Sequence, residues 1–217
     1  MAGAVAVGVD GSRESMAAVA WATAEAGARG ASLRLVCAQD WPTGLRRDSS
    51  TEAESRAAAR LRQARTRALE LRPASKVTGE VRDEAPAEVL LEAAGTADLL
   101  VLGSRGLGGV EGFVLGSVGL SVLAHAARPV VAVRARDPHT AGPVVAGLDL
   151  HHSYEAVLEF AFAYAARRGR LLRVVHAWSF PLWYLWRPFV VYRGRAATRP
   201  VEPGTSGRRR RRIGARY

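Results

Sequence analysis

The 217-residue sequence has one cysteine, Cys37, so it cannot form an intramolecular disulfide. It lacks any apolar run near the roughly 20 residues that a membrane-spanning helix needs. The nearest candidate, residues 180–192, is interrupted by Pro181, Arg187 and Pro188. The first residues have no basic segment before an apolar stretch, which predicts that they are not a signal peptide. These absences predict a cytoplasmic protein with no membrane partner.

Metal-binding patterns are also missing. The five histidines are scattered, and none has a cysteine or carboxylate at ligand spacing. The sequence therefore predicts no metal site.

Positive charge is unevenly distributed. Residues 1–140 hold 17 Lys+Arg against 16 Asp+Glu, whereas residues 141–217 hold 14 against 4. The net charge of +11 thus belongs to the C-terminal part, which includes the run Arg208–Arg212. Such a run can bind nucleic acid electrostatically, but the near-neutral first part argues against a nucleic-acid-binding protein as a whole. Nucleic acid is therefore not the expected partner.

Strand-like and helix-like segments alternate from the N-terminus to Arg134. Apolar runs at residues 4–9, 33–38, 99–102 and 130–133, and a weakly alternating segment at 76–82, are separated by four helical patterns. Strands that are apolar on both faces and alternate with helices indicate a parallel sheet covered on both sides. The sequence therefore predicts an α/β fold with a five-stranded, parallel, Rossmann-like sheet. The apolar positions expected in the first helix are Ala17, Val19, Ala20, Ala24 and Ala28.

The sequence contains an internal repeat. Residues 144–181 align without a gap on residues 5–42, and 14 of the 38 positions are identical, including Gly8/Gly147 and Asp10/Asp149. This predicts a partial second copy of the domain. We expect a complete domain at 1–137, a linker at 138–142, a partial second domain at 143–183 and a basic tail of disordered composition at 184–217. A shifted reading frame and a natural tail both account for this ending.

Glycines follow the fourth strand in the spacing Gly-x2-Gly-x9-Gly-Ser. Gly103 and Gly106 come directly after the strand, and Gly116 and Ser117 precede an apolar helix. Glycines let backbone N–H groups approach phosphate oxygens, and a helix N-terminus favours an anion. The spacing is neither that of a Walker A loop nor that of the dinucleotide fingerprint. It predicts a phosphate-binding loop from Gly103 to Ser117.

Two charged residues are candidates for the site, Arg105 within this loop and Asp10 at the end of the first strand, and each has two interpretations. Asp10 ends the first strand, at the edge where ligands of open parallel sheets bind, but it can also act only in capping the next helix. Arg105 can pair with phosphate or point into solvent.

Together these motifs resemble the universal stress protein family, in its ATP-binding branch. The resemblance covers residues 5–134, with V-G-V-D-G-S at the start, L-V-L-G-S-R-G-L-G-G at the loop and R-P-V-V-A-V-R at the close. It extends to residues 144–178, so the chain is similar to the tandem type with a truncated second domain. The resemblance implies an adenine nucleotide hydrolase-like fold, and either a homodimer or packing between tandem domains of one chain.

The resemblance also implies a ligand and its site. The ligand is ATP, with or without Mg²⁺, held as an adenine nucleotide. Asp10 would contact the adenosine part, Ala38 would pack on the adenine, and the loop would bind ribose and phosphates. The implied site residues are Asp10, Ala38, Gly103, Arg105, Gly106, Gly116, Ser117 and Val118.

The implied function is stress-response regulation through nucleotide-dependent conformation or dimerisation. No catalytic residue is expected, and ATP hydrolysis is at most weak. The second copy keeps Asp149 without a matching loop, so one nucleotide site is expected. Two other functions remain open: an interaction scaffold of the same fold without a nucleotide, and nucleic-acid binding through the Arg-rich tail.

Overall fold

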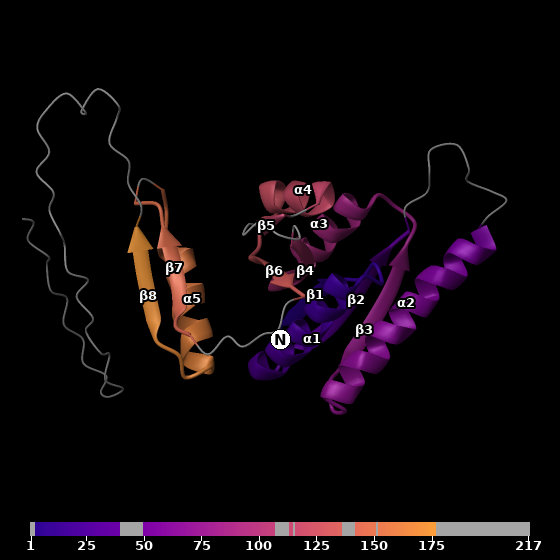
Figure 1. Ribbon diagram of the computed structural model, residues 1–217, viewed down its shortest axis with the longest axis horizontal. Helices are drawn as coiled ribbons and strands as arrows, with labels where there is room; N and C mark the ends of the chain where they lie inside the picture. Colours follow the sequence, from indigo (N-terminus) through magenta and orange to yellow (C-terminus); the bar gives the residue numbers. More distant parts are fainter. Residues whose placement is uncertain are drawn as a thin grey trace, which may run out of the picture.

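A five-stranded parallel sheet forms the centre of the N-terminal part of the chain (Figure 1). The computed structural model describes residues 3–39, 50–106, 113–114, 116–135, 142–150 and 152–176. The strands are β1 (Ala4–Gly8), β2 (Ser32–Ala38), β3 (Val77–Arg82), β4 (Leu99–Gly106) and β6 (Val130–Arg134), in the spatial order β3-β2-β1-β4-β6. A two-residue strand, β5 (Phe113–Val114), pairs antiparallel with the end of β4. The predicted five-stranded parallel sheet is confirmed.

Helices cover both faces of this sheet. The helices α1 (Arg13–Arg29) and α2 (Ser50–Leu71) pack on one face, and α3 (Pro86–Thr96) and α4 (Ser117–His125) pack on the other. Successive side chains of a strand point to opposite faces. Val5 and Val7 of β1 therefore enter the α1/α2 core, while Ala6 enters the α3/α4 core. This arrangement explains why β1 and the first half of β4 are apolar without interruption.

The buried face of α1 differs from the predicted one. Val19 is buried as expected, but Ala24 and Ala28 are exposed. Alanine occurs on every side of this helix, so its spacing cannot show which side meets the sheet. The buried residues are Ser15, Ala18, Val19, Ala22, Thr23, Glu25 and Ala26.

β4 continues through residues that were expected to begin the phosphate loop. Gly103 and Ser104 pair in parallel with β6, and the backbones of Arg105 and Gly106 pair antiparallel with β5. The first four residues of the predicted loop are therefore strand, because partners are available for their backbone groups. Residues 107–112 and Leu115 of the predicted loop lie outside the described residues.

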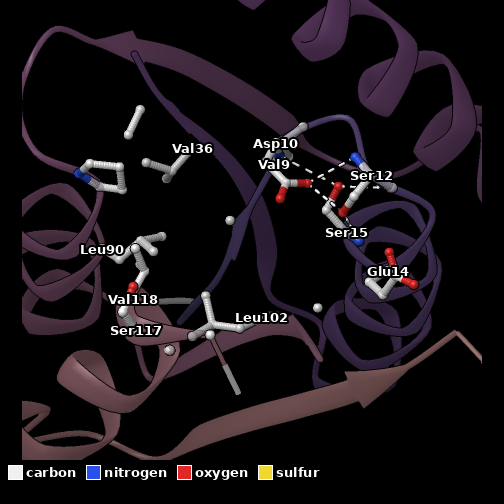
Figure 2. A pocket seen from close by; sticks show the side chains of 16 residues that line it. Val9, Asp10, Ser12, Glu14, Ser15, Val36, Leu90, Leu102, Ser117 and Val118 are labelled. Carbon is white, nitrogen blue, oxygen red and sulfur yellow. Dashed lines mark hydrogen bonds between the residues drawn. The ribbon is translucent and has the colours of Figure 1, made fainter. Parts of the chain in front are cut away.

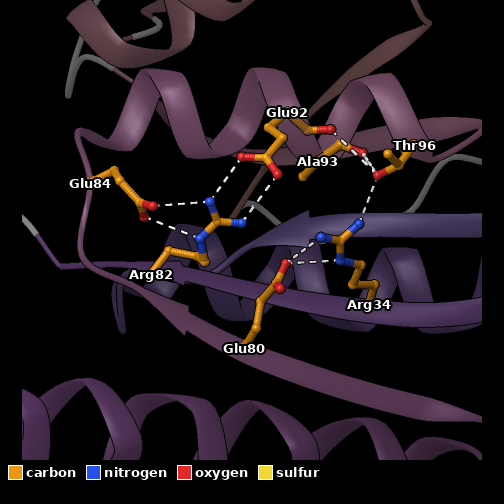
Figure 3. A network of polar contacts seen from close by, with 7 residues as sticks. All are labelled: Arg34, Glu80, Arg82, Glu84, Glu92, Ala93 and Thr96. Carbon is orange, nitrogen blue, oxygen red and sulfur yellow. Dashed lines mark hydrogen bonds and ion pairs between the residues drawn. The ribbon is translucent and has the colours of Figure 1, made fainter.

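A network of ion pairs connects α3 to the edge formed by β2 and β3 (Figure 3). Arg34 of β2 pairs with Glu80 of β3 at 2.5 Å and donates a hydrogen bond to Thr96 of α3 at 2.7 Å. Arg82 of β3 pairs with Glu92 of α3 at 2.9 Å. Exposed pairs of this kind contribute about 0–1 kcal/mol each. The network therefore orients α3 on the sheet more than it stabilises the fold.

Residues 142–176 form a second βαβ unit. Its elements are β7 (Val144–Leu148), α5 (Glu155–Arg167) and β8 (Leu172–His176), and the two strands pair in parallel. The pair Val144/Leu172 in this unit is the counterpart, in the alignment of the repeat, of the pair Val5/Leu33 of β1 and β2. The register of the second unit is thus that of the first two strands.

The second unit packs against α1 of the first. Glu25 of α1 is fully buried. It forms ion pairs with Arg167, the last residue of α5, at 2.9 Å, with Arg168, which follows it, at 2.5 Å, and with Arg29 at 2.7 Å. Burial raises the pKa of the Glu25 carboxyl, but the hydrogen bonds and charges of Arg168 and Arg29 together lower it by more. The pKa therefore lies below the usual 4.5. Glu25 is therefore ionised at neutral pH and joins the two units.

Replacing Glu25 with glutamine tests this contact. We expect Glu25→Gln to lower the opening free energy of the α5 amides by about 1–3 kcal/mol, because Arg167 and Arg168 of the second unit lose a charged acceptor. Hydrogen exchange over residues 155–167 measures this opening. The matched control is Glu70→Gln, which removes only the exposed Arg67–Glu70 pair.

The same measurement has a pH dependence. Because the folded-state pKa is lowered, the contribution of Glu25 should be constant above pH 4.5 and disappear as the pH falls through the lowered value. The loss of α5 protection at low pH should be smaller in Glu25→Gln than in the wild type. Equal protection of α5 in the variant and the wild type at pH 7 would contradict the assignment.

Candidate functional site

A cavity of about 410 Å³ opens at the carboxyl ends of β1 and β4 (Figure 2). In the order of strands across the sheet, β2 and β3 lie to one side of β1, whereas β4 and β6 lie to the other side of β1. Ligands of open α/β sheets bind where the strand order reverses in this way, and small-molecule sites commonly enclose roughly 300–1,000 Å³. The cavity is lined by Gly8, Val9, Asp10, Ser12, Glu14, Ser15, Val36, Ala38, Pro86, Leu90, Leu102, Gly103, Gly116, Ser117, Val118 and Gly119.

The turn between β1 and α1 forms one wall of the cavity (Figure 2). Asp10 Oδ1 accepts hydrogen bonds from the Ser12 backbone N–H at 2.8 Å and from its hydroxyl at 2.5 Å. Ser12 Oγ in turn accepts from the Ser15 N–H at 3.1 Å, which caps α1. Asp10 therefore does support the helix cap, and it remains exposed at the cavity.

The N-terminus of α4 forms the opposite wall. Its N-cap residue, Gly116, makes no side-chain capping hydrogen bond, and the first helical bond runs from the Leu120 N–H to the Gly116 carbonyl at 3.0 Å. The N–H groups of Ser117, Val118 and Gly119 precede this bond and so have no partner within the helix. Unpaired N–H groups and the helix dipole favour an anion at this wall.

Apolar side chains from three elements line the space between these walls. Val36 and Ala38 come from β2, Leu90 from α3 and Leu102 from β4. Pro86, the first residue of α3, completes this surface. The cavity thus combines an apolar surface with a helix N-terminus suited to negative charge.

Gly103 has no side chain for a structural reason. A Cβ atom there would lie 2.5 Å from the carbonyl carbon of Glu14 and 2.6 Å from the backbone nitrogen of Ser15. Backbone atoms cannot move aside as a flexible side chain can. Gly103 is therefore required for the first turn of α1 to cross β4, whatever the cavity binds.

The structure brings six of the eight predicted site residues together around the cavity: Asp10, Ala38, Gly103, Gly116, Ser117 and Val118. For Arg105 and Gly106 it describes only the backbone, paired with β5. Their part in the site stays a prediction.

Sequence reasoning missed the lining residues contributed by the starts of two helices. Glu14 and Ser15 lie in the first turn of α1, and Pro86 and Leu90 lie in the first two turns of α3. The signal was present, because each helix that follows a parallel strand begins at the carboxyl edge of the sheet. Ser12 and Pro86 marked those helix starts in the sequence.

Cys37 is a core residue of β2. Its side chain is fully buried, and burial raises the pKa of its thiol above the usual 9.0. A protonated, buried thiol is a weak nucleophile. Within the described residues, no group of three His, Cys, Asp or Glu side chains could hold a metal ion, and no helix is long and apolar enough to cross a membrane.

A parallel sheet covered on both faces, with a cavity at the reversal of strand order, defines an α/β protein of the Rossmann-like class. Residues 1–134 match the universal stress protein family, and the chain belongs to this family. A universal stress protein of Mycolicibacterium smegmatis is 34% identical over 186 residues, covering 80% of this chain and 63% of the relative. One from Mycobacterium tuberculosis H37Rv is 34% identical over 200 residues, with coverages of 81% and 62%. The chain thus spans less than two thirds of the length of these relatives.

Solved structures resemble the first unit. A universal stress protein from Archaeoglobus fulgidus aligns with a TM-score of 0.51 at 22% identity, over 61% of this chain and 94% of that chain. A universal stress protein solved in complex with cAMP aligns with a TM-score of 0.48 at 32% identity, over 61% and 97%.

Replacing Gly103 with alanine tests the crossing of α1 over β4. We expect Gly103→Ala to lower the free energy of unfolding by about 1–3 kcal/mol, because its Cβ would overlap helix backbone. Urea denaturation measures this change. The control is Gly95→Ala within α3, where a Cβ meets no atom within 4 Å and the change should stabilise the fold by roughly 0.5–1 kcal/mol. A Gly103→Ala variant as stable as the wild type would show that the crossing is looser than described.

Proposed function

We propose that this chain is an ATP-binding stress-response regulator that acts in the cytoplasm. The observation that carries the proposal is the α4 N-terminus, without a side-chain cap, facing the apolar cavity at the reversal of strand order. An apolar surface suits a nucleobase, and backbone N–H groups at a helix N-terminus suit phosphate. The resemblance of residues 5–134 to the ATP-binding branch of the universal stress protein family implies the same ligand class.

A nucleotide would use the two ends of the cavity differently. The base would pack against Ala38 and Leu90, and the adenosine part would reach Asp10. The phosphates would accept hydrogen bonds from the N–H groups of Ser117 and Val118. No lysine or arginine is among the described lining residues, so backbone groups would supply the protein's share of charge stabilisation.

Magnesium would enter with the nucleotide. The described residues contain no cluster of three carboxylate, histidine or cysteine side chains that could hold Mg²⁺ alone. Mg²⁺ commonly binds through substrate phosphates and keeps several waters. We therefore assign it to the phosphate oxygens of bound ATP.

We propose regulation through binding, with at most weak hydrolysis. The two carboxylates of the cavity, Asp10 and Glu14, lie on the α1 side, whereas the phosphates would lie at α4 (Figure 2). A general base must lie within hydrogen-bond reach of the attacking water. Nucleotide occupancy would instead change the conformation or the self-association of the chain.

We also propose that residues 143–183 begin a second domain of the same fold, after a linker at 138–142. The support is the shared register of β7/β8 and β1/β2, and a left-handed glycine at each helix end, Gly30 at φ 65° and Gly169 at φ 58°. Asp149 follows β7 as Asp10 follows β1. The described part of this unit has no counterpart of α4, so we assign one nucleotide site to residues 1–137. The proposed tail, 184–217, lies outside the described residues.

Replacing Gly116 with alanine tests the anion-binding wall. Among the described residues, a Cβ at Gly116 meets no atom within 4 Å, and its φ of −60° suits any residue. The variant should therefore fold normally but bind ATP with Mg²⁺ at least about tenfold more weakly. The added methyl group would stand at the N-terminus of α4, where the phosphates are proposed to bind. Isothermal calorimetry measures the Kd, and Gly95→Ala is the control. Unchanged ATP affinity would reject this wall as the phosphate site.

The two equivalent aspartates provide a second test. Asp10→Asn keeps an oxygen that can accept the Ser12 hydrogen bonds but removes the negative charge. We expect it to weaken ATP binding about three- to tenfold, through loss of a charge-assisted hydrogen bond. Asp149→Asn, the matched change in the second unit, should leave the Kd unchanged. A larger effect from Asp149→Asn would place the nucleotide in the second unit.

A further inference from the structure

The contact between α1 and α5 is built from equivalent positions of the repeat. In the gapless alignment of the two copies, Phe160 corresponds to Trp21 and Arg168 corresponds to Arg29. This equivalence does not depend on nucleotide binding.

Equivalent residues exchange contacts across the interface. The Arg29 guanidinium lies over the Phe160 ring, 5.4 Å from its centroid, and the Arg168 guanidinium lies over the Trp21 ring at 5.6 Å. Both separations are within the range of cation–π attraction. When residue i contacts residue j and their equivalents contact in return, the interface has two-fold character and each half is self-complementary.

We propose that the face of α1 formed by Trp21, Glu25 and Arg29 is a self-complementary docking surface. In this chain α5 occupies it. When α5 is displaced, the same face of a second copy of this chain takes its place, and the two copies pair α1 to α1.

The charged contacts of the interface carry over to such a pair. The 2.5 Å ion pair between Arg168 and Glu25 corresponds to Arg29 of one copy bonding Glu25 of the other, and this contact would occur twice. The stacking of arginine on Trp21 would also occur twice. The pair would hold two carboxylates and two guanidinium groups, so its charges balance.

One unsatisfied atom of Arg29 also favours a second copy of this chain as the partner. Arg29 Nη2 is buried and has no hydrogen-bond partner among the described residues. Position 164 of α5, which corresponds to Glu25, carries a tyrosine. In the α1–α1 pair a second Glu25 stands at that position, where its carboxylate can accept from Arg29.

The present occupant can be displaced because its own unit is small. β7 and β8 form a two-stranded sheet, with Val145 and Val174 exposed. Two strands and one helix bury little apolar area of their own. The contact with α1 is therefore a large part of what holds α5 in place.

The test uses the full chain and reverses charge on α5. In Arg167→Glu/Arg168→Glu, two carboxylates face Glu25, so α5 should lose its protection against hydrogen exchange. Sedimentation velocity at protein concentrations up to about 100 μM detects a dimer with a micromolar Kd. We expect the wild type to sediment as a monomer and this variant to sediment as a dimer. The control Arg173→Glu makes the same kind of charge reversal at one exposed site on β8 and should remain monomeric with α5 protected.

A third substitution makes the test specific to α1. Adding Arg29→Glu to the double variant places a carboxylate against Glu25 of the second copy, and the dimer should dissociate. Circular dichroism checks that this variant folds. The proposal is wrong if the double variant keeps α5 protected, if it stays monomeric with α5 displaced, or if its dimer survives Arg29→Glu.

Discussion

The close crossing of α1 over the end of β4 is the constraint on which the rest of the structure depends. The backbone of Glu14 and Ser15 lies so near Gly103 that no side chain fits between them. This contact fixes the first turn of α1 beside the reversal of strand order, where it forms one wall of the cavity. Because α1 is a continuous helix from Arg13 to Arg29, the same contact also sets where its last two turns meet α5.

The glycines of the predicted phosphate loop therefore have different physical roles. Gly103 is needed by the fold, because helix backbone occupies the space of its Cβ. Gly116 has no described atom near its Cβ position and has a backbone conformation available to any residue, so the described part of the fold does not require glycine there. A glycine that the fold does not require indicates a ligand more strongly than one that it does. A phosphate would therefore be held by Gly116 and the start of α4 more than by the strand end.

Much of the fold could be predicted from the sequence, because its signals are local. Apolar runs such as Leu99–Leu102 identify strands buried on both faces, and alternation with helices identifies a parallel sheet. Ser12 and Pro86 marked helix starts, and the sheet edge that they share located the cavity. The side of α1 that is buried could not be predicted, because alanine lies all around it and carries little directional information.

The role of Glu25 was also beyond sequence reasoning. A glutamate on a helix is ordinarily solvated, and the burial of this one depends on three arginines, two of which lie far along the chain in the second unit. The alignment of the repeat matched the two helices, but it could not show that they touch. That information exists only once both units are folded.

The differences between the two halves of the α1–α5 contact decide which pairing is preferred. A symmetric α1–α1 pair would bury two Glu25 carboxylates, which is costly when charges leave water even though two Arg29 guanidinium groups balance them. In α5 the equivalent position is Tyr164, which instead stacks on Trp21 with ring centroids 6.1 Å apart. The position equivalent to Ala28 is Arg167, which adds an ion pair to Glu25. The in-chain partner thus replaces a second buried carboxylate with a stacking contact and gains a cation.

The α1–α5 contact has more arginines than carboxylates, and aromatic rings lie against two of these arginines. Arg168 lies 4.1 Å from the centroid of the Tyr164 ring, and Arg29 lies over Phe160. The aromatic faces stabilise guanidinium groups that the single carboxylate cannot neutralise. The surface of α1 is therefore compatible with its own copy but better matched to α5. Pairing within one chain also needs no second molecule, so like-with-like association is suppressed for as long as α5 stays in place.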